Sequence, residues 1–417
     1  MIDLNKINVI KRDGRLKDFD YGRINDAIDK AYLEVYGHKC GIDLEDDITD
    51  EIIALAEDNG AISVEEIQDI VVGVLMEEDS KVGEAYESYR RERNFEREKN
   101  SDFNQLVNRT LNCLNIQNSN ANVDESSFGG RKFECAGALM RQHALNYLIP
   151  KEIADAHRNN IIYQHDLDSY SIGEHNCSFV DGKNLINKTG FSTRNGDVRP
   201  AKNLETALQL LAVIFQIQSQ EQFGGVGLAN YDYEIEEQVE ISFKKLFCEV
   251  IEDDYDKILN WEELPEEINL ENEDELIEKY PKIMNKVMKK LNKMGLNATV
   301  GLYHNLNTLE SRPGSQVPFT SINFGLRTTK AGRLLSKWVL QASLEGIGKH
   351  HRTSIFPISI FQYSQGINSD EGDPNYDLKQ LAIKSMTHRI YPNWVNNNWK
   401  NNVYDPNNPE TAMSTMG

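Results

Sequence analysis

The sequence predicts an α/β protein of two domains, and three observations support this. Near the start, Asp13-Gly14 stands between two short apolar-containing stretches, and this dipeptide favours the type I′ turn of a β-hairpin. The next segment repeats apolar residues at helical spacing. From about residue 104 onward, short β-branched runs such as residues 355–361 mix with helical periods such as residues 207–220.

The first domain is predicted to consist of the hairpin followed by helices. One helix should bury a face made of Ile24, Ala27, Ile28, Ala31, Tyr32 and Val35. Ser63 and Glu66 have the spacing of a capping box, which predicts the start of another helix. The buried face of that helix would be Val64, Ile67, Val71, Val74 and Leu75.

Residues 88–99 interleave both charge signs, as expected of an exposed helix or a linker. We therefore expect a first domain over residues 1–95 and a second over residues 104–417. Between about 233 and 292 the chain is acidic, rich in lysine and helical in pattern, which predicts a solvated helical face. No fixed-period repeat interrupts this organisation.

Composition narrows the classes of function. The 417 residues carry a formal net charge of -21, from 66 acidic and 45 basic residues, which disfavours direct DNA binding. The longest strongly apolar run, residues 210–215, is far too short to cross a bilayer, so we expect a cytoplasmic protein with no membrane partner. The five cysteines form no C-x-x-C pair, which predicts neither a disulfide framework nor a metal site and suits a reducing compartment.

The hairpin carries the first candidate binding site. Lys11 and Arg12 precede the Asp13-Gly14 turn, and Arg23 lies on the following helix. Charge-assisted hydrogen bonds and outward-pointing turn amides can hold a triphosphate. On these residues alone, a solvated basic hairpin tip is the alternative.

A second candidate site combines residues 163–166, which contain His165, with residues 173–178, which contain Asn176 and Cys177. A thiol can donate hydrogen to a radical, and its oxidised form can be reduced again. A small buried cysteine and a structural His-Asp pair are the alternatives that these residues leave open.

Two further sets of loops could approach a ligand. Residues 119–122, 128–132 and 222–225 combine asparagines with paired glycines, although such glycines also mark ordinary turns. Residues 311–325 combine two prolines, Gly314 and several hydroxyl side chains suited to phosphate.

The chain resembles the anaerobic, class III ribonucleotide reductases. The resemblance is densest at Ser-Arg-Pro-Gly-Ser-Gln-Val-Pro-Phe over residues 311–319 and Ser-Ile-Asn-Phe-Gly over residues 321–325. It implies an ATP-cone over residues 1–95, followed by the first part of a ten-stranded α/β barrel of the ribonucleotide reductase and glycyl-radical enzyme type. It also implies that ATP and dATP bind the cone as effectors through Val9, Lys11, Arg12, Asp13, Gly14 and Arg23.

The same resemblance implies the chemistry of the second domain. Cys177 would be the reducing cysteine, with Asn176 and His165 orienting the sugar hydroxyls. Contacts to the ribonucleoside triphosphate substrate would come from Ser119, Asn120, Asn122, Ser311, Ser315 and Ser321. Formate would be the reductant, the protein would form a homodimer, and an activase with a 4Fe-4S cluster and S-adenosylmethionine would generate the radical.

The resemblance also raises an expectation about the end of the chain. The sequence stops at Met416-Gly417, where the family continues with Cys-Arg. The thiyl cysteine, the radical glycine and the zinc-binding cysteines would then lie on a complementary C-terminal polypeptide. We expect a split gene or an intein or intron rather than an arbitrary truncation, and a chain inactive by itself.

Two other functions are weighed against this one. The chain could be a non-catalytic nucleotide-sensing module that regulates a partner. It could instead be another glycyl-radical enzyme, such as a relative of the formate lyases, although the cone and the 311–325 run argue against that.

Overall fold

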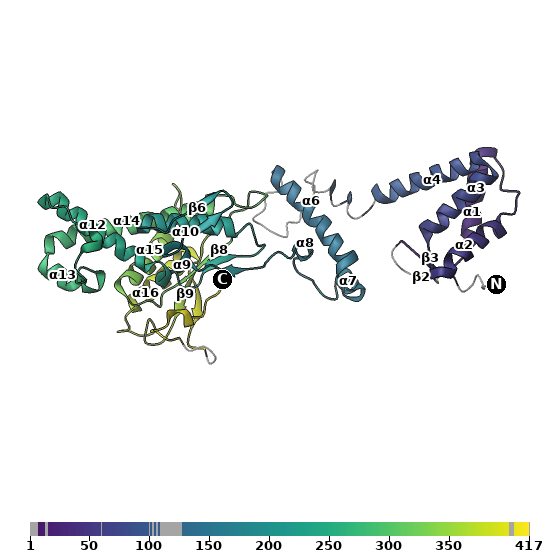
Figure 1. Ribbon diagram of the computed structural model, residues 1–417. Coiled ribbons are helices and arrows are strands. Elements are labelled where there is room, and N and C mark those ends of the chain that lie inside the picture. The colour runs from purple at the N-terminus through teal and green to yellow at the C-terminus, as the bar shows by residue number, and fades with distance from the viewer. Residues whose placement is uncertain are drawn as a thin grey trace. The chain divides into compact units, whose positions relative to one another are not determined.

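The computed structural model describes residues 7–12, 16–59, 61–99, 101, 104–105, 107–108, 127–399 and 404–416. The chain forms two compact units, Met1–Asn108 and Arg109–Gly417, and each is described by itself (Figure 1).

In the first unit, strands β1 (Asn8–Ile10) and β2 (Leu16–Asp18) pair antiparallel, which confirms the predicted hairpin. Residues 13–15, which include Asp13 and Gly14, lie outside the described residues. Strand β3 (Ala61–Ser63) pairs parallel with β1. Four helices accompany this small sheet: α1 (Gly22–Tyr36), α2 (Glu45–Asn59), α3 (Val64–Glu78) and α4 (Ser80–Lys99).

Local signals predicted two helices of this unit, α1 and α3. Helix α1 buries Ile24, Ile28, Ala31 and Tyr32, as its periodicity predicts. The capping box at the start of α3 is confirmed, because the Glu66 N–H donates to Ser63 Oγ at 3.2 Å and the Ser63 N–H donates to the Glu66 carboxylate at 2.7 Å. The charged stretch at 88–99 is the second half of α4 rather than a linker.

The second unit is built on five parallel strands in the order β10-β9-β8-β7-β4. Their bounds are β4 Ser178–Phe179, β7 Val226–Leu228, β8 Thr320–Phe324, β9 Ile358–Tyr363 and β10 Asn393–Asn396. Helices connect successive strands: α10 (Leu204–Gln218), α12 (Glu236–Tyr255), α14 (Pro281–Thr308), α15 (Lys330–Glu345) and α16 (Tyr376–Arg389). The predicted α/β class is confirmed, while the full ten-stranded barrel stays a prediction.

The described residues of the second unit also form other elements. They are α6 (Phe128–His143), a π-helix (Ala144–Leu148), α7 (Lys151–Arg158), α8 (Leu167–Tyr170), α9 (Gly182–Asn187), β5 (Phe191–Thr193), β6 (Gly196–Val198), α11 (Tyr231–Glu234), α13 (Glu273–Lys279) and the 3₁₀ turns Trp261–Glu263, Leu270–Asn272 and Pro409–Thr411. Strands β5 and β6 form an antiparallel hairpin.

The two faces of the five-stranded sheet differ in chemistry, because alternate residues of a strand point to opposite faces. Ile322, Phe324 and Phe361 belong to the apolar core shared with the helices. Ser321, Asn323 and Gln362 alternate with them and are also buried, at 2%, 0% and 0% exposed. The polar face of the sheet is therefore covered by something other than the helical layer.

The stretch from 233 to 292 is helical but is not simply a solvated face. Its helices α12 and α14 contribute Val239, Phe243, Leu246, Val287 and Leu291 to the apolar core. The apolar residues recur at helical spacing among the charged ones, so each helix presents one buried face and one charged face. Among the helices of the described residues, none combines the length and the hydropathy needed to cross a membrane.

Candidate functional site

The polar face of the sheet holds the C-terminal segment 413–416. The side-chain amide of Asn323 makes two hydrogen bonds with the backbone of Thr415. It donates to the carbonyl and accepts from the N–H, each at 3.0 Å. Ser321 Oγ donates to the Met416 carbonyl at 2.7 Å, and Gln362 Nε2 donates to the Met413 carbonyl at 3.1 Å. Buried polar side chains thus pair with the backbone of segment 413–416, which explains why they occur inside buried strands.

Cys177 precedes β4 and lies beside the loop of residues 222–225. The Gly225 N–H donates to Cys177 Sγ at 3.2 Å, and the Gly224 N–H donates to the Asn176 carbonyl at 2.7 Å. The thiol in turn donates to Asn176 Oδ1 at 3.2 Å. The side chain of Cys177 is exposed, so this cysteine is not the small buried hydrophobe that the sequence left as an alternative.

Gly224 lets the loop approach the thiol, and the neighbouring Gly225 lies beside the C-terminal segment. A Cβ atom on Gly224 would lie 2.5 Å from Cys177 Sγ and would overlap the Asn176 oxygens. A Cβ atom on Gly225 would lie 3.7 Å from Met416 Sδ. Gly225 therefore lies between two groups: its N–H donates to the sulfur of Cys177, and its α-carbon faces the side chain of Met416, the last described residue.

His165 lies in a hollow of about 270 Å³ with Asp166, Ser169, Tyr170, Gly173, Glu174 and Phe223. Its Nδ1 contacts the carboxylate of Asp166, and its side chain is 76% exposed. Phe223 also donates its N–H to the His175 carbonyl at 2.9 Å. The 222–225 loop thus connects the hollow around His165 with Asn176 and Cys177.

The predicted serines are held differently from one another. Ser311 Oγ lies 2.8 Å from Ser219 Oγ, so this hydroxyl has a protein partner. Ser315 follows Gly314 in a turn where both residues have positive φ, 58° and 81°. Ser321 lies on β8 and binds Met416. Ser119, Asn120 and Asn122 lie outside the described residues.

Arg312 is a site residue that the sequence interpretation missed. Its guanidinium donates to the carbonyls of Ser219, Phe223 and Gly224. A possible signal was the arginine itself, since it stands in an otherwise apolar and turn-forming run of the densest motif.

Two carboxylates are buried near the carboxyl ends of the strands. Asp232 accepts from the N–H groups of Gly325 at 2.8 Å and Arg327 at 3.2 Å, and burial raises its pKa to about 6 against these bonds. Glu234 accepts from the N–H groups of Gly182 and Asn230, and burial raises its pKa to about 7. The sequence analysis singled out neither residue.

In the first unit, the predicted cations form a positively charged group. Burial lowers the pKa of Lys11, and the charges of Arg23 and Arg12 lower it further. The Arg12 Nε lies 2.5 Å from a Glu65 carboxylate oxygen, and Arg23 pairs with Asp20 at 3.2 Å. Val9 is 3% exposed and lies on β1, the central strand between β2 and β3.

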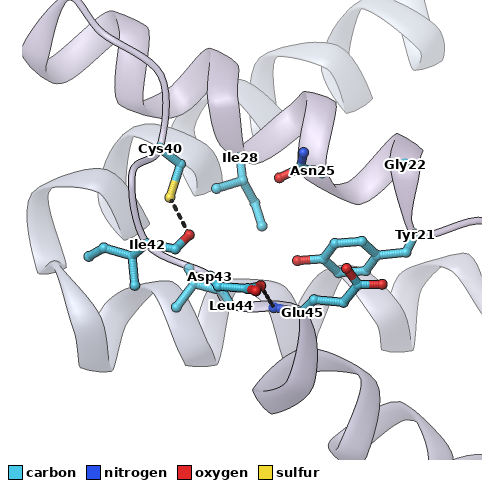
Figure 2. Close-up of a pocket in the computed structure, with 9 residues that line it drawn as sticks. All are labelled: Tyr21, Gly22, Asn25, Ile28, Cys40, Ile42, Asp43, Leu44 and Glu45. Atoms are coloured by element: carbon cyan, nitrogen blue, oxygen red, sulfur yellow. Dashed lines mark hydrogen bonds between the residues drawn. The ribbon is translucent and has the colours of Figure 1, made fainter.

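A separate hollow of about 170 Å³ lies between the start of α1 and the loop that leads into α2 (Figure 2). The nine residues that line it include Asp43 and Glu45 but no lysine or arginine. Burial, with the charges of Glu45 and Asp43, raises the pKa of Tyr21 there to about 12. This hollow disfavours a polyphosphate, so the triphosphate prediction applies to the group around Lys11.

Comparison with known proteins shows which family the chain belongs to. A family model described as anaerobic ribonucleoside-triphosphate reductase matches residues 119–417. The chain belongs to the anaerobic ribonucleoside-triphosphate reductase family. An ATP cone domain model matches residues 7–95, so the first unit contains an ATP-cone.

Several relatives are anaerobic ribonucleoside-triphosphate reductases. That of Haemophilus influenzae is 30% identical over 403 residues, covering 94% of this chain and 52% of that protein. That of Escherichia coli is 29% identical over 396 residues, covering 93% and 51%. The chain thus spans about half the length of the curated relatives that it matches.

Among solved structures, an anaerobic ribonucleotide reductase from Thermotoga maritima in complex with dATP and CTP is similar, with a TM-score of 0.48 and 15% identity. The similarity covers 74% of this chain and 48% of that one. The family match over residues 119–417 favours the reductase over a nucleotide-sensing module, because it lies outside the cone.

Proposed function

We propose that this chain forms part of an anaerobic ribonucleoside-triphosphate reductase, with Cys177 on the wall of the substrate pocket. The observation that carries the proposal is the meeting of the Cys177 sulfur and the Met416 side chain at Gly225. A hydrogen-donating thiol is thereby held beside segment 413–416. In the family that the chain resembles, this segment leads to the thiyl cysteine. The family match over the same residues supports this assignment.

In the proposed reaction, hydrogen replaces the 2′-hydroxyl of the nucleotide. A ribonucleoside triphosphate, formate and a proton give the deoxyribonucleoside triphosphate, carbon dioxide and water. Cys177 donates hydrogen at C2′, and Asn176 and His165 orient the sugar hydroxyls by hydrogen bonds. The resemblance implies that a glycyl radical would start the reaction, and that an activase with a 4Fe-4S cluster and S-adenosylmethionine would generate this radical.

Substrate contacts in this proposal come from both predicted groups of polar residues. Ser311, Ser315 and Ser321 support it through their positions in the turn and on the polar sheet face, although Ser311 and Ser321 already have protein partners. Ser119, Asn120 and Asn122 complete the set. The catalytic domain, proposed over residues 104–417, would form part of a ten-stranded barrel.

The cone, proposed over residues 1–95, binds ATP or dATP at the hairpin and regulates the reductase. The cations Lys11, Arg12 and Arg23 support this, because several positive charges at one surface favour a triphosphate. Val9, Asp13 and Gly14 complete the proposed effector site. We further propose a homodimer in the cytoplasm.

The test measures deoxyribonucleotide formation under anaerobic activation with formate. The chain is assayed alone and together with a second polypeptide that carries the rest of the family sequence. Formation of product only when both are present supports the proposal. Binding of dATP with no product in any combination contradicts it and favours the nucleotide-sensing module.

A further inference from the structure

Arg312 is positioned to control the loop that holds the candidate thiol. Its Nη1 donates to the Phe223 carbonyl at 3.0 Å, and its Nη2 donates to the Gly224 carbonyl at 2.6 Å. Its Nε donates to the carbonyl of Ser219, at the end of α10. The guanidinium also lies over the ring of Phe319, with Cζ 5.5 Å from the ring centre. All three nitrogens are thus used on one short stretch of backbone.

The carbonyls of Phe223 and Gly224, which bind Arg312, belong to consecutive peptide groups. In the first, the Phe223 carbonyl binds Arg312 and the Gly224 N–H donates to the Asn176 carbonyl at 2.7 Å. In the second, the Gly224 carbonyl binds Arg312 and the Gly225 N–H donates to Cys177 Sγ at 3.2 Å. Each peptide group therefore connects the guanidinium with the Asn176-Cys177 pair.

This arrangement orients and polarises the donors that reach the thiol. A cation on a carbonyl oxygen strengthens the N–H donor of the same peptide group, because successive hydrogen bonds polarise one another. Burial lowers the pKa of Arg312, and the nearby charge of Glu174 raises it.

We propose that Arg312 is a positioning residue for the Cys177 sulfur, acting through the peptide groups 223–224 and 224–225. The inference rests on the proposed role of Cys177 as hydrogen donor, and it adds a residue that fixes the direction and the polarity of that thiol. If Arg312 only stabilised the loop, replacing it would not change the reactivity of the Cys177 sulfur.

The experiment measures the rate at which iodoacetamide alkylates each cysteine of the full chain at neutral pH, resolved by peptide mass spectrometry. In Arg312→Gln we expect alkylation of Cys177 to slow by about threefold or more, because the Gly225 N–H that donates to the sulfur loses the guanidinium that orients and polarises its peptide group. Alkylation of Cys135, on α6, should stay unchanged. Arg312→Lys keeps the charge but not the fork of donors, so its rate should lie between the two.

Arg389→Gln is the matched control. The Arg389 guanidinium also binds backbone carbonyls, those of Leu344 and His351, but none of them leads to Cys177. This variant should alkylate Cys177 at the parent rate. Circular dichroism and amide hydrogen exchange of the 223–226 stretch accompany each variant, and exchange at Gly225 should rise in Arg312→Gln.

An unchanged Cys177 rate in a folded Arg312→Gln variant overturns the inference, as does an equal slowing at Cys135. Should Arg312→Gln not fold, Arg312→Lys decides, and a rate equal to the parent's overturns the inference. The assay needs neither nucleotide nor radical, so the positioning role can hold or fail independently of reductase activity.

Discussion

Replacing Gly224 with alanine tests how the thiol is held. Gly224 is not among the glycines with positive φ, so an alanine there meets no backbone strain. Its methyl group would, however, lie 2.5 Å from Cys177 Sγ and would overlap the oxygens of Asn176. Ordinary carbon contacts need about 3.5 to 4.0 Å, so the Asn176-Cys177 pair must move by about 1 Å.

The expected cost follows from this displacement. Overpacking of a well-fitted site costs about 1–3 kcal/mol. The loss of the two hydrogen bonds, from Gly224 to Asn176 and from Gly225 to Cys177, would cost a similar free energy, at about 1 kcal/mol each. We therefore expect Gly224→Ala to lower the free energy of unfolding of the second unit by about 2 kcal/mol.

The assay is urea unfolding followed by circular dichroism, with Gly301→Ala as the control. Gly301 lies inside helix α14, and a Cβ atom there meets nothing within 4 Å. Alanine at this position should stabilise the unit by up to about 1 kcal/mol, since glycine is unfavourable within helices. If Gly224→Ala proves as stable as the parent, the contact between the loop and the Asn176-Cys177 pair is misassigned.

Three further outcomes are expected. Ser63→Ala should cost the first unit about 1 kcal/mol in urea unfolding, because it removes a helix cap; no loss would mean the cap is unimportant. Glu234, whose pKa is raised by burial to about 7, should contribute stability that is present below its unfolded pKa and lost as pH rises through about 7. The difference in unfolding free energy between the parent and Glu234→Gln should therefore change across this window, by up to about 3 kcal/mol, and a flat difference would contradict the assignment. Lys11→Gln should weaken dATP binding by about tenfold in calorimetry, unlike Lys30→Gln on the exposed face of α1, and equal effects would contradict a site at the hairpin.

The first unit was largely predictable because its signals are local. The turn dipeptide, the apolar period of α1 and the capping box at Ser63 each act within a few residues, and the structure forms the predicted hairpin and helices. The α/β class of the second unit also followed from alternating patterns along the chain.

The candidate site was only partly predictable, because long-range contacts assemble it. Cys177, Asn176 and His165 were chosen by resemblance, but the loop that connects them was left undecided between a site and a turn. Arg312 is 88 residues from Gly224 in sequence, and no periodicity reports such a contact.

Two polar residues have partners that the sequence did not indicate. Ser311 was predicted as a substrate contact, and its hydroxyl pairs with that of Ser219. Glu234 stands in a highly charged stretch that suggests solvent, yet it is 7% exposed. Charged residues are mostly exposed, so a buried carboxylate with backbone partners is invisible without the fold.

The central claim is that Cys177 delivers hydrogen to the nucleotide sugar. Its most direct test is deoxyribonucleotide formation by the chain reconstituted with the rest of the family sequence, under anaerobic activation, comparing Cys177→Ser with Cys135→Ser. The account predicts that Cys177→Ser forms no product while Cys135→Ser retains the parent's activity. Product formation by Cys177→Ser at the parent rate would contradict it.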